Sequence, residues 1–343
     1  MKNKTFWAFV GPSVFMMVLF IAVPLVAVFF QSFTWTYGLY EQVEVETCSP
    51  GFTTQTCVTE IKQRPVFYDV GVRQFESRFV GLDTYRSLLR TGRVQQAWAE
   101  GDWTYPFRNL EFYRALRFTV MFTLITLPLV IGLGLLIALA VNSTIKSIRG
   151  PVTFVSLLPF IITPVIGALS IRWLFIGDGL LTRGLEVLLS RDISMFSQAW
   201  TIELLMLFYR VWYVAPFAFV IFYAGLQTLN QDTMDAAIVD GASRWERLKS
   251  IIMPHLLPLI VFVTLIHLMD AYRVFEEVIG FSSEAHVISL QWLTWDLLTP
   301  DDAGNRAMSR AAASSMLTMV GIVILLIPVL RRTWKENRNS EAR

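Results

Sequence analysis

Charged residues are scarce in this chain: Asp, Glu, Lys and Arg make up 16% of its 343 residues, whereas 54% are hydrophobic. Soluble domains carry about a quarter charged residues. So little polar surface cannot cover a water-soluble globule, which excludes a cytosolic enzyme, a nucleic-acid-binding module and a disordered scaffold. The formal net charge of +2 favours no particular partner. The composition therefore indicates an integral membrane protein.

The residue patterns of common catalytic and metal sites are also missing. No Gly-Lys pair occurs, so the chain lacks the P-loop that holds ATP. Its three histidines, His255, His267 and His286, are too scattered for zinc ligation, and no Gly-x-Ser-x-Gly elbow is present. We expect no catalysis, no metal and no cofactor in this chain.

Only two cysteines occur, Cys48 and Cys57, and they enclose a short polar loop. A loop of this size can close a disulfide in an oxidising, exported compartment, and no other cysteine exists to pair with either. We predict that bond, with two unrelated free thiols as the alternative.

Long apolar runs are what the sequence does contain, and crossing a bilayer takes about 20 such residues. Backbone polar groups in lipid must be hydrogen-bonded within the protein, so only helices or a closed barrel can span the bilayer. These runs are too long for barrel strands. The fold class is therefore an all-α integral membrane protein. The first run is longer than the apolar part of a signal peptide and ends without a clear cleavage site. The six predicted spans are Trp7–Phe30, Phe118–Val141, Val152–Phe175, Ile202–Leu226, Leu256–Val274 and Met308–Leu330.

Basic residues in the short flanks set the orientation, because they collect on the cytoplasmic side. With six spans, all of these clusters fall on one side, so both termini are predicted to be cytoplasmic. The opposite side receives the segment with both cysteines. There residues 79–89 place Leu82, Tyr85 and Leu89 on one helical face, and irregular structure is expected before them. The basic clusters are Lys2 and Lys4; Lys146 and Arg149; Arg244, Arg247 and Lys249; and Arg331, Arg332, Lys335 and Arg338.

The cytoplasmic loop between spans four and five predicts a helix–turn–helix. Residues 232–239 suit a short helix, and Gly241 permits a turn that a side chain would hinder. Ser243 is an expected N-cap with Glu246 three residues later, the spacing of a capping box.

The second helix of this loop is amphipathic. Trp245, Leu248 and Ile252 form its apolar stripe, and Pro254 is expected to open the next membrane helix. The small residues Ala236 and Ala237 let another protein's surface approach closely.

This loop resembles the EAA motif of ABC importer permeases. The match is carried by Asp235-Ala236-Ala237, by Asp240-Gly241-Ala242 and by Ile251-Ile-Met-Pro254, with Asp235 where Glu is usual. The resemblance implies a six-helix ABC type I importer permease bundle of the carbohydrate-uptake family, of the maltose/glycerol-phosphate first-permease type. Further matching stretches are Phe79–Tyr85, Gly150 with Leu158-Pro159, Trp173 with Phe175, Trp212 with Pro216-Phe217, and Ala224–Gln227.

The resemblance and the spans together divide the chain into four segments. Residues 1–31 are a cytoplasmic N-terminus and the first transmembrane helix, and residues 32–115 are a periplasmic segment with the cysteines and the amphipathic helix. Residues 116–331 are a five-helix permease core with the coupling loop at 228–254, and residues 332–343 are a cytoplasmic tail.

The resemblance also implies partners and a location. They are a second permease subunit, two copies of an ABC ATPase that bind ATP and Mg, a periplasmic or extracellular solute-binding protein, and the lipid bilayer of a bacterial inner membrane; no nucleic acid is implied. Asp235 and Asp240 would offer carboxylates to basic residues of the ATPase, and Trp245 would anchor the second helix by burial.

Charged residues within the spans indicate the substrate path, because they should face a cavity or a partner. Arg210 and Asp270 lie at similar depth, roughly 25 Å from the inner ends of their helices at about 1.5 Å per residue. We predict that they pair, with His267 one turn inward of Asp270. Snorkelling of both to the outer interface is the alternative.

Aromatic residues cluster at the same depth. Tyr209, Trp212 and Tyr213 share a face of span four, and Trp173 lies near the outer end of span three. Such rings stack on sugars, but they also form interfacial belts. Arg172 and Arg273, together with Arg210, favour an anionic solute as an alternative.

Three functions therefore compete. The first is import of a sugar or sugar derivative. The second is import of a polyol, a glycerol phosphate or other anionic sugar derivative, a phosphodiester, or a polyamine. The third belongs to another class, an autonomous ion-coupled carrier or channel, which would need no loop for docking an ATPase.

Overall fold

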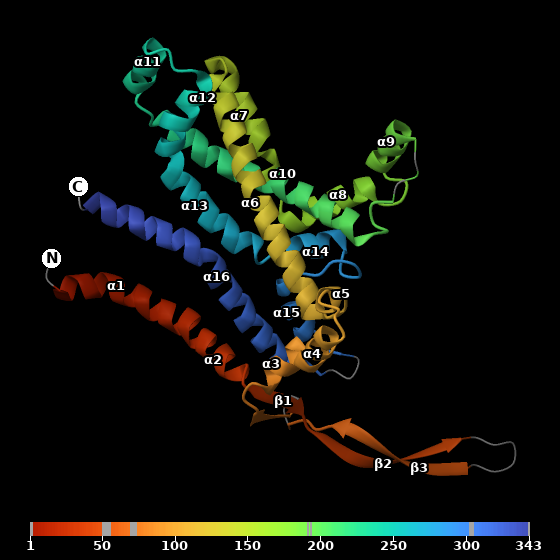
Figure 1. Cartoon of the computed structure of the whole chain (residues 1–343). Helices are drawn as coiled ribbons and strands as arrows, with labels where there is room; N and C mark the ends of the chain where they lie inside the picture. Colours follow the sequence, from red (N-terminus) through yellow and green to blue (C-terminus); the bar gives the residue numbers. More distant parts are fainter. Residues whose placement is uncertain are drawn as a thin grey trace. The chain divides into compact units, whose positions relative to one another are not determined.

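A computed structural model describes residues 3–49, 56–68, 74–190, 192, 194–301 and 305–341 (Figure 1). It divides into two compact units. Unit 1 comprises Met1–Gln96 with Thr294–Leu317, and unit 2 comprises Ala97–Leu293 with Thr318–Arg343. Three helices continue from one unit into the other: α4 (Thr91–Ala99), α15 (Leu290–Leu298) and α16 (Met308–Glu341).

Unit 1 begins with one long apolar helix that confirms the first predicted span. It consists of α1 (Asn3–Met17), the π-helical turn η1 (Val18–Ala22) and α2 (Val23–Gln31). Pro24 has no N–H to donate to the preceding turn, and the wider π turn lies directly before it. No residue in the most apolar window of Phe6–Gln31 is buried within the chain, so this helix offers its whole circumference to lipid or to another subunit.

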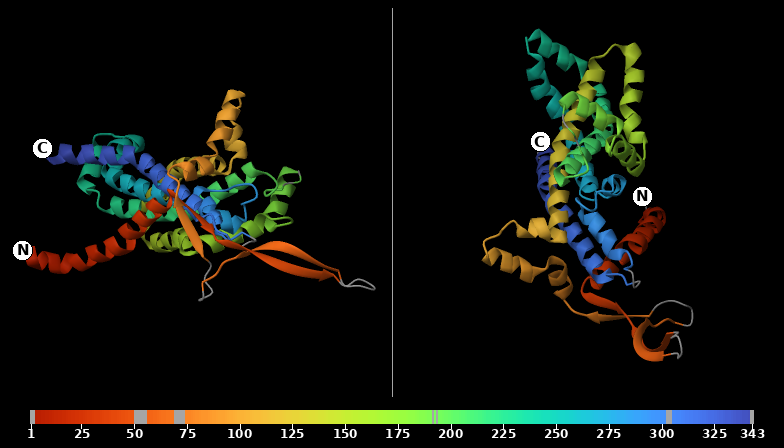
Figure 2. Two further views of the ribbon diagram at one scale, coloured as in Figure 1. Left: turned by 90° about the horizontal axis from the view of Figure 1, so that it is seen from below. Right: turned by 90° about the vertical axis from the view of Figure 1, so that its right-hand side faces the viewer.

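Four strands follow, which corrects the expectation of irregular structure before residue 79. β1 (Thr34–Gly38) pairs antiparallel with β4 (Phe75–Phe79), and β2 (Tyr40–Ser49) with β3 (Thr56–Pro65). Figure 2 shows β2 and β3 as a long twisted ribbon. β-Branched and aromatic residues fill β1, and they pack well on a pleated surface.

The β2–β3 register sets Cys48 directly opposite Cys57 in the backbone ladder. Directly paired residues have Cα atoms about 4.5–5.5 Å apart, within the span of a disulfide. The two side chains lie outside the described part of the chain, so the bond stays a prediction.

The predicted amphipathic segment is partly confirmed. Its helical part is α3 (Asp83–Leu89), preceded by a turn at Gly81 with φ of 58°. Tyr85 packs inward and its hydroxyl donates to Ser32 Oγ at 2.8 Å. Leu82 lies before the helix and is exposed, so it does not belong to the packed face.

Unit 2 is built on two long helices, α6 (Glu111–Ser143) and α10 (Ala199–Gln227), which pack along each other. Their close approach depends on Gly134, where an added Cβ would lie 2.6 Å from the Ala218 Cβ. Phe219 and Phe222 fill the core beside them. The other helices of unit 2 are α5 (Tyr105–Asn109), α7 (Lys146–Ile161), α8 (Pro164–Phe175), α9 (Leu180–Leu189), α11 (Gln231–Val239), α12 (Arg244–Arg247), η2 (Leu248–Ile252), α13 (Met253–Ala271) and α14 (Glu276–Phe281).

The third predicted span, Val152–Phe175, is not one straight helix. α7 and α8 meet at an angle of 93°. The break falls at Ile162 and Thr163, both with ψ of 140°, because a proline at position 164 disfavours helical geometry in the residue before it. α8 then packs on α14, where an added Cβ on Gly280 would lie 2.5 Å from the Ala168 Cβ.

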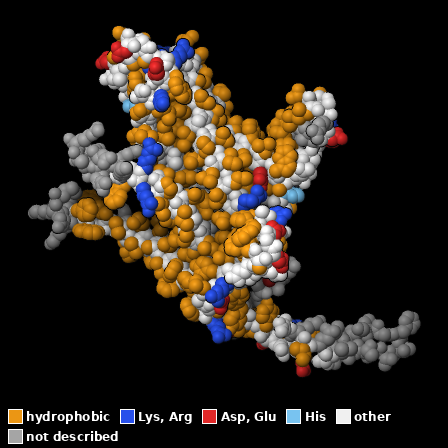
Figure 3. All heavy atoms as spheres, in the orientation of Figure 1, with side chains coloured by type: hydrophobic (Ala, Val, Ile, Leu, Met, Phe, Trp, Pro, Cys, Tyr) orange, Lys and Arg blue, Asp and Glu red, His pale blue; other side chains and the backbone are white. Residues whose placement is uncertain are grey.

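Among the described residues, five helices are long and apolar enough to cross a membrane, or six if the bent α7–α8 pair is one span. Figure 3 shows hydrophobic side chains spread over the helices of unit 2, and acidic and basic ones gathered where α11 and α12 lie. The helical membrane fold expected from the sequence is confirmed. The predicted four-segment division is topological and stays a prediction beside these two compact units.

Candidate functional site

The first candidate region is the elbow, defined here as α11, α12 and the turn between them (residues 231–247). The side chain of Asn230 caps α11 by accepting a bond from the Asp232 N–H at 2.8 Å. Gly241 follows the helix with φ of 78°, a conformation that side chains disfavour. The predicted helix and the glycine turn are both confirmed.

The capping box that begins α12 is also confirmed. The Glu246 N–H donates to Ser243 Oγ at 3.3 Å, and the Ser243 N–H donates to Glu246 Oε2 at 2.7 Å. Pro254 lies in the first turn of α13, as expected, but α12, η2 and α13 run on as one continuous helix, Arg244–Ala271. The π turn η2 lies just before Pro254, where a backbone donor is missing.

The elbow's surface is open in this chain. Asp235, Ala236, Asp240 and Gly241 are exposed, whereas Ala237 is half-buried. Trp245 was expected to anchor its helix by burial, but it is 70% exposed among the described residues. The elbow therefore exposes an indole, a side chain enriched in protein interfaces, together with carboxylates that could pair with basic residues of a partner.

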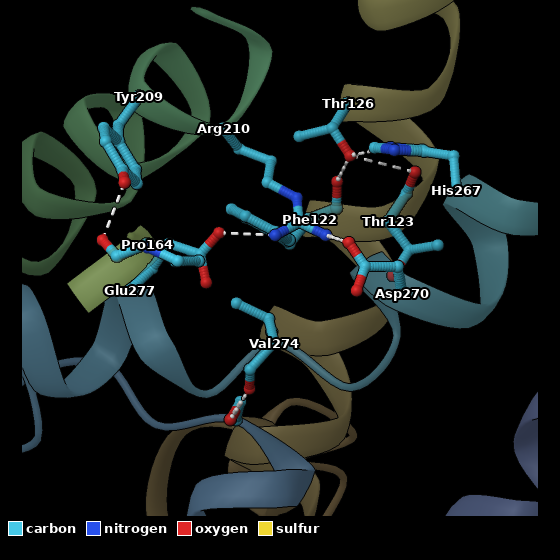
Figure 4. A network of polar contacts seen from close by, with 11 residues as sticks. Phe122, Thr123, Thr126, Pro164, Tyr209, Arg210, His267, Asp270, Val274 and Glu277 are labelled. Atoms are coloured by element: carbon cyan, nitrogen blue, oxygen red, sulfur yellow. Dashed lines mark hydrogen bonds and ion pairs between the residues drawn. The ribbon is translucent and has the colours of Figure 1, made fainter. Parts of the chain in front are cut away.

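The second candidate region is a buried ionic network between α10, α13 and α14 (Figure 4). Arg210 makes an ion pair with Asp270, as predicted, and the buried position of its guanidinium rules out snorkelling. Its other amino group donates to Glu277 Oε1 at 2.7 Å. The sequence analysis missed Glu277, although two adjacent acidic residues, Glu276 and Glu277, are an unusual feature of so apolar a region.

His267 extends this network toward α6. Thr126 Oγ1 lies 2.9 Å from His267 Nε2 and donates its own hydrogen to the Phe122 carbonyl at 2.8 Å. Because that hydroxyl has only one hydrogen, the ring nitrogen is the donor in the His267 contact. The predicted placement of His267 one turn from Asp270 on α13 is confirmed.

The network is closed on one side and open on the other. Glu277 is fully buried, whereas the Asp270 side chain is 56% exposed. Three buried atoms have no hydrogen-bond partner among the described residues: Arg210 Nε, Glu277 Oε2 and His267 Nδ1. The charged groups sum to −1, with one guanidinium against two carboxylates. Asp270 is thus the carboxylate of this network that is exposed at the surface of this chain.

The aromatic candidates do not act as one group. Tyr209 is buried, and its hydroxyl donates to the Pro164 carbonyl at 2.7 Å, so its ring braces α8. Tyr213 stacks against Tyr209, with ring centroids 5.7 Å apart, and is half-buried, as is Trp212. Trp173 is exposed on α8.

The arginines nearby divide in the same way. Arg273 is exposed just after α13, and its Nε donates to the Met269 carbonyl at 3.3 Å. Arg172 is half-buried, and its Nε has no hydrogen-bond partner among the described residues. Within the same described part of the chain, no group of three or more His, Cys, Asp or Glu side chains is placed to hold a metal ion.

Long apolar helices joined by an exposed helix–turn–helix elbow are features of the permease class of ABC importers. The family described as "Binding-protein-dependent transport system inner membrane component" matches residues 107–330. The chain belongs to this family, whose members are transport components rather than enzymes.

Named relatives agree with this assignment. The chain is 28% identical over 225 residues to a trehalose/maltose transport system permease protein, MalF, of Thermococcus litoralis, covering 64% of this chain and 74% of the relative. It is 30% identical over 206 residues to the trehalose transport system permease protein SugA of Mycobacterium tuberculosis, covering 59% of each. It is 26% identical over 260 residues to the sn-glycerol-3-phosphate transport system permease protein UgpA of Escherichia coli, covering 74% and 80%.

Solved structures show the same fold. A bacterial ABC transporter involved in the import of the acidic polysaccharide alginate matches with a TM-score of 0.66 and 16% identity, over 97% of this chain and 96% of that one. A second structure, of the alginate transporter in complex with an alginate pentasaccharide-bound periplasmic protein, matches with a TM-score of 0.67 over 96% and 93%. The expected importer permease fold is thereby confirmed.

Proposed function

We propose that this chain is the pore-forming permease subunit of an ATP-driven importer for a neutral sugar or sugar derivative. The observation that carries this proposal is the exposed elbow, in which carboxylates, small residues and an uncovered Trp245 surround a glycine turn. A self-sufficient carrier has no need of such a surface. The relatives named for trehalose, maltose and lactose transport support the sugar class.

The partners follow from the same reading. We infer a second permease subunit, two copies of an ABC ATPase that bind ATP and Mg and grip the elbow, and a solute-binding protein on the outer side. The elbow and both termini then face the cytoplasm, and residues 32–115 face the periplasm. That compartment would keep the Cys48–Cys57 bond oxidised.

The ionic network supports a neutral cargo. Arg210 is neutralised by two carboxylates, so the buried cation is not available to hold an anion. An anionic sugar derivative such as a glycerol phosphate is the second candidate. It is favoured by the likeness to UgpA and by Arg273, which is exposed near the network.

The test is nucleotide-dependent uptake by the complete transporter in proteoliposomes, with Gly241→Val as the variant. A β-branched residue at φ of 78° costs roughly 1–3 kcal/mol of backbone strain, so the turn must rearrange. We expect normal membrane insertion, retained ATP hydrolysis and at least roughly tenfold slower trehalose uptake, since about 1.4 kcal/mol corresponds to a factor of ten.

Gly184→Val is the matched control, because Gly184 also has open space around it but lacks a positive φ. It should transport normally. Normal coupled uptake by the Gly241 variant would contradict the elbow's role. Uptake by this chain alone, without nucleotide, would place it among autonomous carriers instead.

A further inference from the structure

Unit 1 contains a pocket of about 550 Å³ that the transport mechanism above does not use. Two parts of the chain line it, the β1–β4 sheet with the start of β2, and residues of 296–301 and 305–310 at the end of α15 and the start of α16. This volume lies within the roughly 300–1,000 Å³ that small-molecule sites occupy. It is therefore large enough for one or two sugar rings.

One wall of the pocket is aromatic. It is formed by Trp35 and Tyr37 from β1, Tyr40 from β2 and Phe75 from β4. Trp35 and Tyr37 are two residues apart on a strand, so their side chains leave the same face. All four rings are partly uncovered, with exposed fractions of 39%, 41%, 41% and 40%. Partly exposed rings that line a concavity can present apolar faces to the C–H edges of a sugar.

The opposite lining is polar and held in place. The Asn305 N–H donates to Asp301 Oδ1 at 2.7 Å, and the Tyr40 hydroxyl donates to Asn305 Oδ1 at 2.9 Å. Thr36 is tied to the start of α16, because its N–H donates to Ser309 Oγ at 3.0 Å. These bonds connect the sheet to the start of α16 and preorganise the pocket's acceptors and donors.

The charges in the described lining cancel. Two carboxylates, of Asp296 and Asp301, stand against two guanidinium groups, of Arg306 and Arg310. Carboxylates accept hydrogen bonds from hydroxyl groups, and guanidinium groups donate hydrogen bonds to hydroxyl oxygens. A lining with both kinds of group therefore matches a polyhydroxylated ligand. Because the net charge of the described lining is zero, it favours neither an anionic phosphate nor a cationic polyamine.

We propose that this pocket is a binding site for a neutral saccharide of one or two rings, a receiving site separate from the ionic network of unit 2. The proposal rests on the proposed function, since a sugar importer supplies the reason for a sugar site on unit 1. The recognition would combine stacking on Trp35 with hydrogen bonds from the polar lining.

The experiment measures sugar binding to the complete transporter in nanodiscs, without nucleotide or binding protein, by saturation-transfer NMR. The probes are trehalose, maltose and lactose. We expect at least one to bind, Trp35→Ala to weaken it roughly three- to tenfold, and Trp35→Phe to restore most of the affinity, as aromatic contacts of about 0.5–1.5 kcal/mol imply. Trp103→Ala is the matched control, because Trp103 is exposed but does not line the pocket. This variant should bind the sugar as tightly as the unchanged protein.

Several outcomes would overturn the proposal. They are binding of none of the three sugars, equal binding by Trp35→Ala and the unchanged protein, or stronger binding of glycerol 3-phosphate than of any sugar. A second measurement adds the binding protein and nucleotide: loss of ATPase stimulation in Trp35→Ala, with sugar binding intact, would overturn the sugar site and assign the pocket to protein docking. Sugar binding that persists in a transporter with no ATP-driven sugar uptake would instead sustain this site and refute the proposed function.

Discussion

Glu277→Gln should destabilise the protein much more than Asp270→Asn, although both variants remove one carboxylate partner of Arg210. Glu277 is fully buried, so its replacement removes the carboxylate partner of Arg210 that is shielded from solvent. Breaking a buried ion pair costs roughly 3–5 kcal/mol where it leaves a charge with no partner. Arg210 keeps Asp270 in this variant, so the cost should lie at or below the lower end of that range. Asp270 is 56% exposed on this chain, and an exposed pair contributes about 0–1 kcal/mol.

The assay is thermal unfolding of the purified transporter in detergent, followed by the intrinsic fluorescence of its tryptophans. We expect a clearly lowered melting temperature for Glu277→Gln and a small change for Asp270→Asn. The double variant Arg210→Met with Glu277→Leu should recover most of the loss, because it removes both buried charges and leaves only the partly exposed Asp270 without its partner.

Equal destabilisation by the two single variants would refute this reasoning, since burial would then not decide the cost. So would a double variant as unstable as Glu277→Gln. Uptake measurements on the same variants separate an effect on stability from an effect on transport. Asp270→Asn should fold normally yet change the affinity for sugar, because Asp270 is the exposed carboxylate of this network.

Two other predictions concern packing and the external segment. Gly280→Val should destabilise unit 2 by about 1–3 kcal/mol or more, because the added atoms overlap Ala168 and the backbone of α8 in a closely packed contact; Gly184→Val has open space and should melt normally. Cys48 and Cys57 should form a bond that shifts electrophoretic mobility on reduction, and Cys48→Ser should migrate like the reduced protein; identical mobility with and without reductant would contradict the disulfide.

Local rules predicted the elbow correctly. A glycine turn, a Ser-x-x-Glu capping box and a short helix each depend on contacts within a few residues, which a single sequence displays. The Arg210–Asp270 pair was also predictable, because the cost of a lone charge in lipid forces a partner at the same depth.

Most of the parts that the sequence analysis missed depend on contacts between distant segments. The bend between α7 and α8 had a local signal at Thr163-Pro164, but its angle is stabilised by packing of α8 on α14 through Gly280. Glu277 lies on the short helix α14, beyond the apolar run, so the hydropathy pattern did not indicate that it is buried. β1 and β4 pair residues far apart in sequence, such as Thr34 with Phe79. β2 and β3 form a local hairpin, and the alternation of Val43-Glu44-Val45-Glu46 in β2 was a signal for it that was not used.

The elbow and the ionic network lie on one continuous helix, and that connection gives the permease a mechanical path. The helix Arg244–Ala271 begins one residue after the Ser243 cap and carries Asp270 at its far end. At about 1.5 Å per residue the two sites are roughly 40 Å apart along one rod. We expect a force on the elbow to move Asp270 relative to Arg210, because the two sites share this helix. The unpaired Arg210 Nε and Glu277 Oε2 are groups that a second arrangement can satisfy. Cross-linking the elbow in place should hence fix the Arg210–Asp270 contact, and a spin label beside Asp270 that still changes environment on nucleotide binding would refute that linkage.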